Sequence, residues 1–214
     1  MANLAQAVNI KLWSGNGEPA KAWGRLKHVR LTHHFQKHQN IRHRTNTSAI
    51  LQDPDLWDPT GDTVIFFSHT RTDPSFRTSS TLLRATASPL LKDMLLVGTV
   101  REGSSFPGVS YKLYMDAPST LASKTDILRY HLATRNLLAF LLRRGLVGFT
   151  FYQALRDLQG RLEEILPVAE DAGVELKRYL VEEGYVDVSN DSRAAAGLLA
   201  WSEEVRWREG WREG

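Results

Sequence analysis

The chain has 214 residues, of which 42% are hydrophobic and 24% charged, a balance typical of a globular domain with a real core. It contains no cysteine, which excludes disulfides and thiolate metal ligands. The first residues lack the charged start and apolar run of a signal peptide, and the longest apolar run, Leu137–Leu142, is too short to cross a bilayer. We therefore expect an intracellular protein, cytoplasmic or nuclear, with no membrane span.

The charge is distributed unevenly along the chain. Residues 1–50 carry eight basic side chains and one acidic side chain, a net charge of +7, whereas the remainder is mildly acidic. Weak periodicity and Gly, Asn and Pro punctuation predict that residues 1–58 form a basic, partly disordered N-terminal arm. The arm could be merely solvated, or it could contact nucleic acid or an anionic surface through charge. The basic residues singled out for this role are Lys27, Arg30, Lys37, Arg42 and Arg44.

The same segment contains five of the seven histidines. On a helix, His34 and His38 would share one face and could form half of a metal site. No Asp, Glu or Cys nearby completes such a site, and the surrounding side chains are cationic. We therefore expect no bound metal and no cofactor.

The sequence of residues 59–166 predicts a core made of a small sheet and helices. Apolar and β-branched runs predict strands over Thr63–Phe67, Ser75–Thr78 and Ser110–Met115. Between the second and third strands, one helix is expected after a cap at Ser80 or Thr81, and another begins at Ser88-Pro89.

The remainder predicts helices. One runs from about Asp126 to Arg144, capped by Ser123 or Thr125, with Gly145 as its terminator. The next, Phe151–Leu166, has a single apolar stripe and is followed by Pro167. Residues 167–214 form a helical C-terminal extension, with one helix stopped by Gly184 and a last helix from Ser192 to near Arg208. The predicted fold class is therefore α+β.

The order strand, strand, helix pair, strand, helices resembles the BTB/POZ domain, an oligomerisation and adaptor fold. The resemblance covers roughly residues 60–166. It rests on Asp62 with Val64–Phe67, on Tyr111–Asp116 and on Leu128–Gly148. It also rests on a spaced set that begins in the second strand and continues through the two helices: Phe76, Leu82, Leu83, Ser88, Pro89, Leu91 and Met94. It implies a BTB/POZ-like core with a protein-binding or oligomerising role.

At finer grain the chain looks like a group of uncharacterised filamentous-fungal proteins related to an early-sexual-development protein. The matching residues are 129–148, 150–158 and 198–214. This resemblance implies a regulatory or developmental role in a fungus. Some members are described as GTP-binding, but no catalytic residues come with the resemblance.

Motifs for catalysis are absent from the sequence. No GxxxxGK[ST] phosphate-binding loop and no GxSxG nucleophile elbow occurs, and the paired glutamates are adjacent on helices, so they point about 100° apart. His131, within a helix, is read as a core or rim histidine rather than a base. Active sites are spatial, however, so an enzyme of unfamiliar type stays open.

The C-terminal aromatic residues are candidates for an interaction surface, since tryptophan is enriched at interface hot spots. They could equally pack on this protein's own body. The residues are Trp201, Trp207 and Trp211.

We therefore predict a non-enzymatic protein-protein interaction module, with self-association or another protein as its partner. The alternative is a nucleotide- (GTP) or nucleic-acid-binding regulator. The expected organisation is a basic arm over 1–58, a BTB-like core over 59–166 and a helical extension over 167–214.

Overall fold

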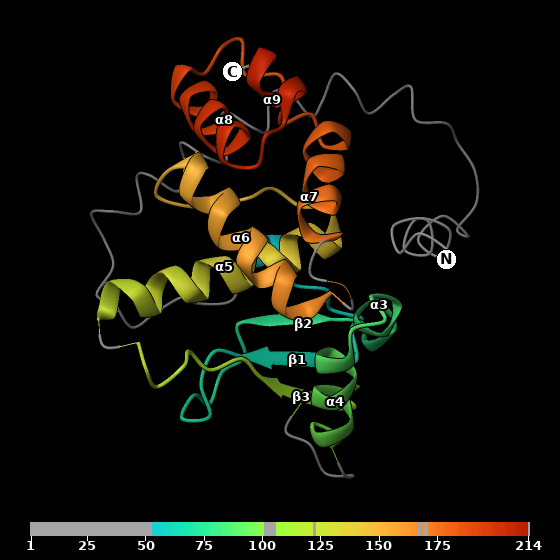
Figure 1. The fold of residues 1–214 in the computed structure, drawn as a ribbon. Helices are drawn as coiled ribbons and strands as arrows, with labels where there is room; N and C mark the ends of the chain where they lie inside the picture. The colour runs from blue at the N-terminus through green and yellow to red at the C-terminus, as the bar shows by residue number, and fades with distance from the viewer. Residues whose placement is uncertain (1–52, 101–105, 122, 167, 169–170, 214) are drawn as a thin grey trace, which may run out of the picture. The chain divides into compact units, whose positions relative to one another are not determined.

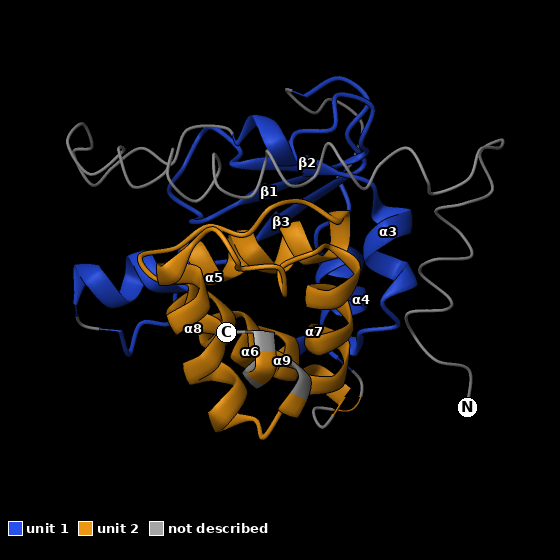
Figure 2. Ribbon diagram, turned by 90° about the horizontal axis from the view of Figure 1, so that it is seen from above, with its two compact units in different colours: residues 1–16, 47–131, 165–167 blue, residues 17–46, 132–164, 168–214 orange. Residues whose placement is uncertain are grey.

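The structure is a computed structural model that describes residues 53–100, 106–121, 123–166, 168 and 171–213 (Figure 1). It is mixed α+β, with a small three-stranded sheet and helices. The chain divides into two compact units (Figure 2). The described part of the first unit is 53–131, with the gaps above, and 165–166; that of the second is 132–164, 168 and 171–213. Most of the predicted arm, residues 1–52, lies outside the described residues.

The sheet belongs to the first unit and confirms the three predicted strands. They are β1 (Thr63–Phe66), β2 (Phe76–Thr78) and β3 (Tyr111–Tyr114), in the order β2-β1-β3 (Figure 1). The central strand β1 pairs antiparallel with β2 and parallel with β3. A short 3-10 turn, η2 (Pro54–Leu56), precedes the sheet.

Buried apolar side chains lie on both faces of the sheet, because successive side chains on a strand point to opposite sides. Ile65 pairs with Phe76 on β2 and with Leu113 on β3, and these three side chains are 0–1% exposed. Val64 and Phe66 point to the opposite face, where they form a second small cluster with Val109. Every residue of β1 is buried, as expected for a central strand.

Two helices connect β2 to β3, α3 (Ser80–Ala85) and α4 (Pro89–Val97). The prediction that the second helix begins at Ser88-Pro89 is confirmed: α4 starts at Pro89, and the Ser88 side chain caps it by accepting a hydrogen bond from the Leu91 N–H. The prediction that Ser80 or Thr81 caps the first was wrong, because Ser79 is the cap. The Ser80 hydroxyl instead donates to the Asp62 carboxylate at 2.6 Å, which ties the start of α3 to the start of β1.

The long helix α5 (Lys124–Leu142) passes from the first unit into the second after His131. Ser123 accepts a hydrogen bond from the Asp126 N–H at 3.0 Å, so the predicted cap is present. Gly145 was wrongly predicted as the terminator. The helix ends at Leu142, and the left-handed residue that follows is Arg143, with φ of 53°.

The second unit is helical, with most of α6 (Phe151–Ile165) and all of α7 (Asp171–Glu182), α8 (Ser192–Glu204) and α9 (Arg208–Glu213) (Figure 1). The predicted stripe on α6 is confirmed, since all its members are at most 3% exposed: Phe151, Leu155, Leu158, Leu162 and Ile165. None of the helices in the described part of the chain is both long and apolar enough to cross a membrane.

The single helix predicted from Ser192 to near Arg208 was wrong, because the chain turns between α8 and α9. Arg206 has φ of 51°, and the Trp207 N–H donates back to the Ser202 carbonyl at 2.8 Å. This left-handed turn is the one that glycine usually makes after a helix. With arginine in that place, the local sequence gives no break signal.

Candidate functional site

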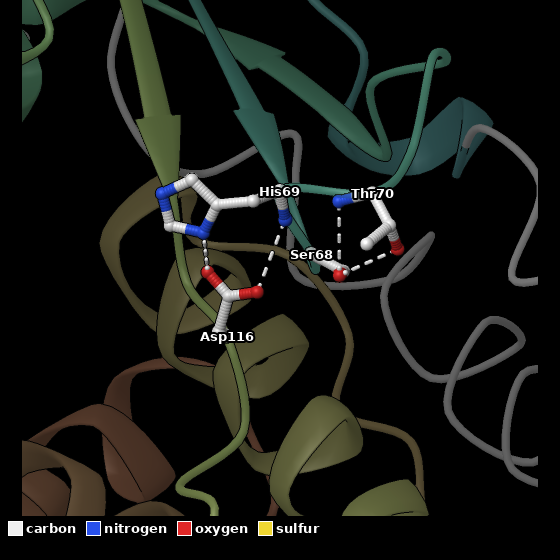
Figure 3. Close-up of polar contacts among 4 residues, drawn as sticks. All are labelled: Ser68, His69, Thr70 and Asp116. Atoms are coloured by element: carbon white, nitrogen blue, oxygen red, sulfur yellow. Dashed lines mark hydrogen bonds and ion pairs between the residues drawn. The ribbon is translucent and has the colours of Figure 1, made fainter.

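The candidate site of the first unit lies where β1 and β3 end (Figure 3). Phe66 is the last residue of β1, and the segment Ser68–Thr70 follows it; Asp116 comes shortly after β3. Because β1 and β3 are parallel, their carboxyl ends meet at the same edge of the sheet. Residues 47 positions apart in the chain are thereby brought into contact.

The central contact joins His69 to Asp116. The imidazole Nδ1 lies 2.5 Å from Asp116 Oδ2, and the His69 backbone N–H donates to Asp116 Oδ1 at 3.0 Å (Figure 3). The His69 ring also stacks on Tyr114, with ring centres 4.1 Å apart and planes within 13°. Its side chain nevertheless remains 70% exposed. The ring is therefore fixed in orientation and open to solvent.

A second histidine lies close to this pair. His131 on α5 stacks on Phe67, with ring centres 4.3 Å apart. Its Nε2 atom is buried without a hydrogen-bond partner. Burial lowers the pKa of His131, the positive charge of Arg71 lowers it further, and the Asp116 carboxylate acts in the opposite direction. His131 is therefore held in its neutral form, in line with the reading of this residue as a core or rim histidine.

The chemistry available at this edge is limited by where the hydroxyl groups point. A carboxylate that fixes Nδ1 leaves Nε2 of His69 as the reactive nitrogen, which is one half of an acid-base arrangement. The Ser68 hydroxyl, however, lies 3.0 Å from that of Thr70 and accepts the Thr70 N–H at 3.2 Å (Figure 3). It is engaged in its own turn rather than aimed at the imidazole. The Ser68 hydroxyl is therefore not placed to act as a nucleophile with His69 as its base.

A second feature of the first unit is an apolar stripe on α4. Leu90 and Val97 lie seven residues apart on the same helix face and are 43% and 86% exposed. Met94, between them on that face, is half-buried, and Leu96 beside it is 76% exposed. The core is served by the adjacent face, where Leu91 and Leu95 are 1% and 0% exposed. The side chains of this outer stripe therefore lie mostly outside the core of their own unit.

The predicted tryptophans lie in the second unit. Trp201 on α8 is fully buried, and its Nε1–H donates to Gln159 on α6 at 3.1 Å. Trp207 is 8% exposed and packs edge-on against Trp201, with ring centres 6.0 Å apart. Trp211 belongs to α9, and its side chain is outside those described. The two described rings pack within their own unit, and a role for the three in partner binding stays a prediction.

The other predicted site residues, Lys27, Arg30, Lys37, Arg42 and Arg44, lie outside the described residues. Within the described ranges, no group of three or more His, Asp or Glu side chains is placed to hold a metal ion.

Two buried tyrosines in the second unit serve the fold. The Tyr179 hydroxyl donates to the Arg144 carbonyl at 2.6 Å, and that of Tyr185 accepts from the Leu146 N–H at 2.6 Å. Burial raises the pKa of both hydroxyls. These bonds satisfy backbone groups in the turn after α5, so we assign both tyrosines a structural role.

Sequence reasoning missed His69 and Asp116, although a signal was present. His69 lies two residues after the predicted strand that ends at Phe67, and Asp116 directly follows the one that ends at Met115. The signal becomes usable only once β1 and β3 are known to be parallel neighbours, because only then do their ends coincide.

The comparisons with known proteins concern the second unit. A family model described as a domain of unknown function (DUF8004) matches residues 174–214, from within α7 to the end of the chain. No curated protein and no solved structure matches the chain.

Proposed function

We propose that the chain is a non-enzymatic protein-protein interaction module with a BTB/POZ-like first unit, acting as an adaptor in a fungal regulatory or developmental pathway in the cytoplasm or nucleus. The observation that carries the proposal is the apolar stripe on α4, in which Leu90 and Val97 are exposed and Met94 between them is half-buried. Large apolar side chains gathered on one exposed helix face are typical of a surface that binds another protein.

The arrangement of the first unit supports the same proposal. An antiparallel β1-β2 pair, two short helices and a parallel third strand follow in the order that the BTB/POZ resemblance implies. The α4 stripe lies within this arrangement, on the helix that leads to β3. A protein that binds through it, either a second copy of this chain or a different protein, would remove Leu90 and Val97 from water.

The test uses the full chain and two matched double variants. Leu90→Gln/Val97→Gln removes the apolar stripe of α4 while keeping good helix formers. The control, Val174→Gln/Val181→Gln, makes the same change at the same spacing on α7, where the two valines are 62% and 54% exposed. Light scattering after size-exclusion chromatography measures self-association. Capture from a nuclease-treated lysate of a filamentous fungus, read by quantitative mass spectrometry, measures other partners.

We expect a stoichiometric partner, self or other, that the wild type and the α7 variant retain and the α4 variant loses. A chain that stays monomeric and captures no protein would count against the proposal. So would a partner that all three proteins bind equally.

A further inference from the structure

The first unit contains a stack of three aromatic rings that runs from its interior to solvent. Phe66, 3% exposed, stacks on Tyr114 of the neighbouring strand, with ring centres 5.2 Å apart and planes at 24°. Tyr114 in turn stacks on His69 at 4.1 Å and 13°. Since 70% of the His69 side chain is exposed while one face lies against Tyr114, its other face is open. The stack therefore ends in a planar surface that a further ring can cover.

The terminal ring is held in place before any ligand arrives. Asp116 accepts hydrogen bonds from both the Nδ1–H and the backbone N–H of His69 (Figure 3). Contact with Tyr114 fixes the ring plane as well. An exposed side chain normally loses rotational freedom on binding, and a ring that is already fixed avoids most of that cost.

The same face of the sheet carries positive charge. Lys112 precedes Tyr114 by two residues, so both point to the face of Val64 and Phe66, and its Nζ lies 5.4 Å from the centre of the Phe106 ring. Arg77 is the register partner of Val64 and shares this face, where it donates to the Gly61 and Pro107 carbonyls. Residues 1–50 add a net charge of +7 to the chain. In proteins that bind single strands, aromatic rings stack on unpaired bases and cationic side chains attract the backbone phosphates.

We propose that the open face of His69 stacks on an unpaired base of a single-stranded nucleic acid, with Lys112 on the same sheet face attracting the backbone phosphates. A duplex keeps its bases stacked on one another, so this surface selects single strands. The site is separate from the α4 stripe and independent of the adaptor role.

The experiment measures binding of the full chain to 15-nucleotide oligonucleotides by fluorescence anisotropy, as uridine RNA, thymidine DNA and a duplex of equal length. A second set carries 2-aminopurine, whose fluorescence falls when the base is stacked. The variants are His69→Ala, which removes the ring, and His69→Phe, which keeps a ring and removes the two imidazole nitrogens. Val174→Gln/Val181→Gln is the surface control, and circular dichroism checks that each variant is folded.

The wild type and His69→Phe should bind single strands within about threefold of each other and quench 2-aminopurine. His69→Ala should bind roughly 5- to 100-fold more weakly and lose the quenching, the range expected when one base loses its stacking partner. Comparing the affinities for the RNA and DNA oligonucleotides shows which nucleic acid the chain prefers. The proposal is overturned if the wild type binds no single strand, if the duplex binds equally well, or if His69→Ala binds like the wild type. Equal weakening in His69→Ala and His69→Phe also overturns it, because it assigns the effect to the imidazole nitrogens rather than to stacking of the ring.

Discussion

The side-chain amide of Asn136 forms two hydrogen bonds with the backbone of Val147, one in each direction. Its Nδ2–H donates to the Val147 carbonyl at 2.7 Å, and its Oδ1 accepts from the Val147 N–H at 2.9 Å. Asn136 is 1% exposed and lies on α5, and Val147 lies in the segment that leads to α6. One buried side chain thus replaces the pairing that a strand partner would give to this residue.

Replacing Asn136 by alanine should destabilise the protein by about 2–4 kcal/mol, because it leaves a buried N–H and a buried C=O without partners. Urea unfolding followed by circular dichroism measures the change. Asn190→Ala, at an exposed position, is the control and should change the free energy of unfolding by less than about 0.5 kcal/mol. Equal midpoints for the two variants would contradict the prediction.

Two glycines on helices of the second unit should respond oppositely to alanine. A Cβ on Gly197 of α8 would lie 2.8 Å from the Tyr152 backbone N and 2.9 Å from the Phe151 Cβ. One helix must then move, at a cost of about 1–3 kcal/mol. A Cβ on Gly160 of α6 meets nothing within 4 Å, so Gly160→Ala should stabilise by about 0.5–1 kcal/mol. The thermal unfolding midpoint of each variant shows whether alanine stabilises or destabilises the protein. A gain in stability for Gly197→Ala would refute the close approach of α8 and α6.

Acid should destabilise the fold partly through His131. Because burial lowers the pKa of His131 in the folded state, the unfolded chain takes up a proton below about pH 6.5 that the folded chain does not bind. The free energy of unfolding therefore falls as the pH drops through this region. His131→Phe keeps a ring against Phe67 and removes the proton site, so its stability should fall less between pH 7.5 and 5.5.

The measurement is the urea midpoint at several pH values for the wild type, His131→Phe and His69→Gln. The last variant keeps His131 and should retain the wild-type loss that His131 causes. Parallel curves for the wild type and His131→Phe would show that His131 does not couple folding to pH.

Trp201→Ala should lower the free energy of unfolding by about 3–5 kcal/mol, since it empties a fully buried site and breaks the bond to Gln159. Trp201→Phe retains most of the ring and should cost less. The measurement is urea unfolding with circular dichroism, beside partner capture under native conditions. If Trp201→Ala lost a partner and kept its stability, the ring would belong to an interface.

The elements that the sequence predicted well are those set by local signals. The β-branched run of Thr63–Phe66, the Ser88-Pro89 cap and the spacing of apolar residues on α6 act over a few positions, and the structure confirms each. The missed features depend on other parts of the chain.

Ser80 looks like a cap in the sequence, but Asp62 holds its hydroxyl, so Ser79 caps α3. Arg143 and Arg206 take left-handed conformations that their residue type does not predict. Likewise, His69 and Asp116 form a pair only because β1 and β3 lie side by side, and that pairing is not encoded in the spacing of either segment.

The parallel pairing of β1 and β3 also bears on the order of folding. The segment that separates β1 from β3 contains β2, α3 and α4, so pairing β3 with β1 closes a long loop. The segment that separates β1 from β2 is much shorter, so their pairing closes a shorter loop. Closing the longer loop costs more chain entropy and is rewarded only when β3 is in register. We therefore expect the β1-β2 hairpin to form first and the His69–Asp116 contact to arise late, so that refolding of the first unit is limited by the arrival of its third strand.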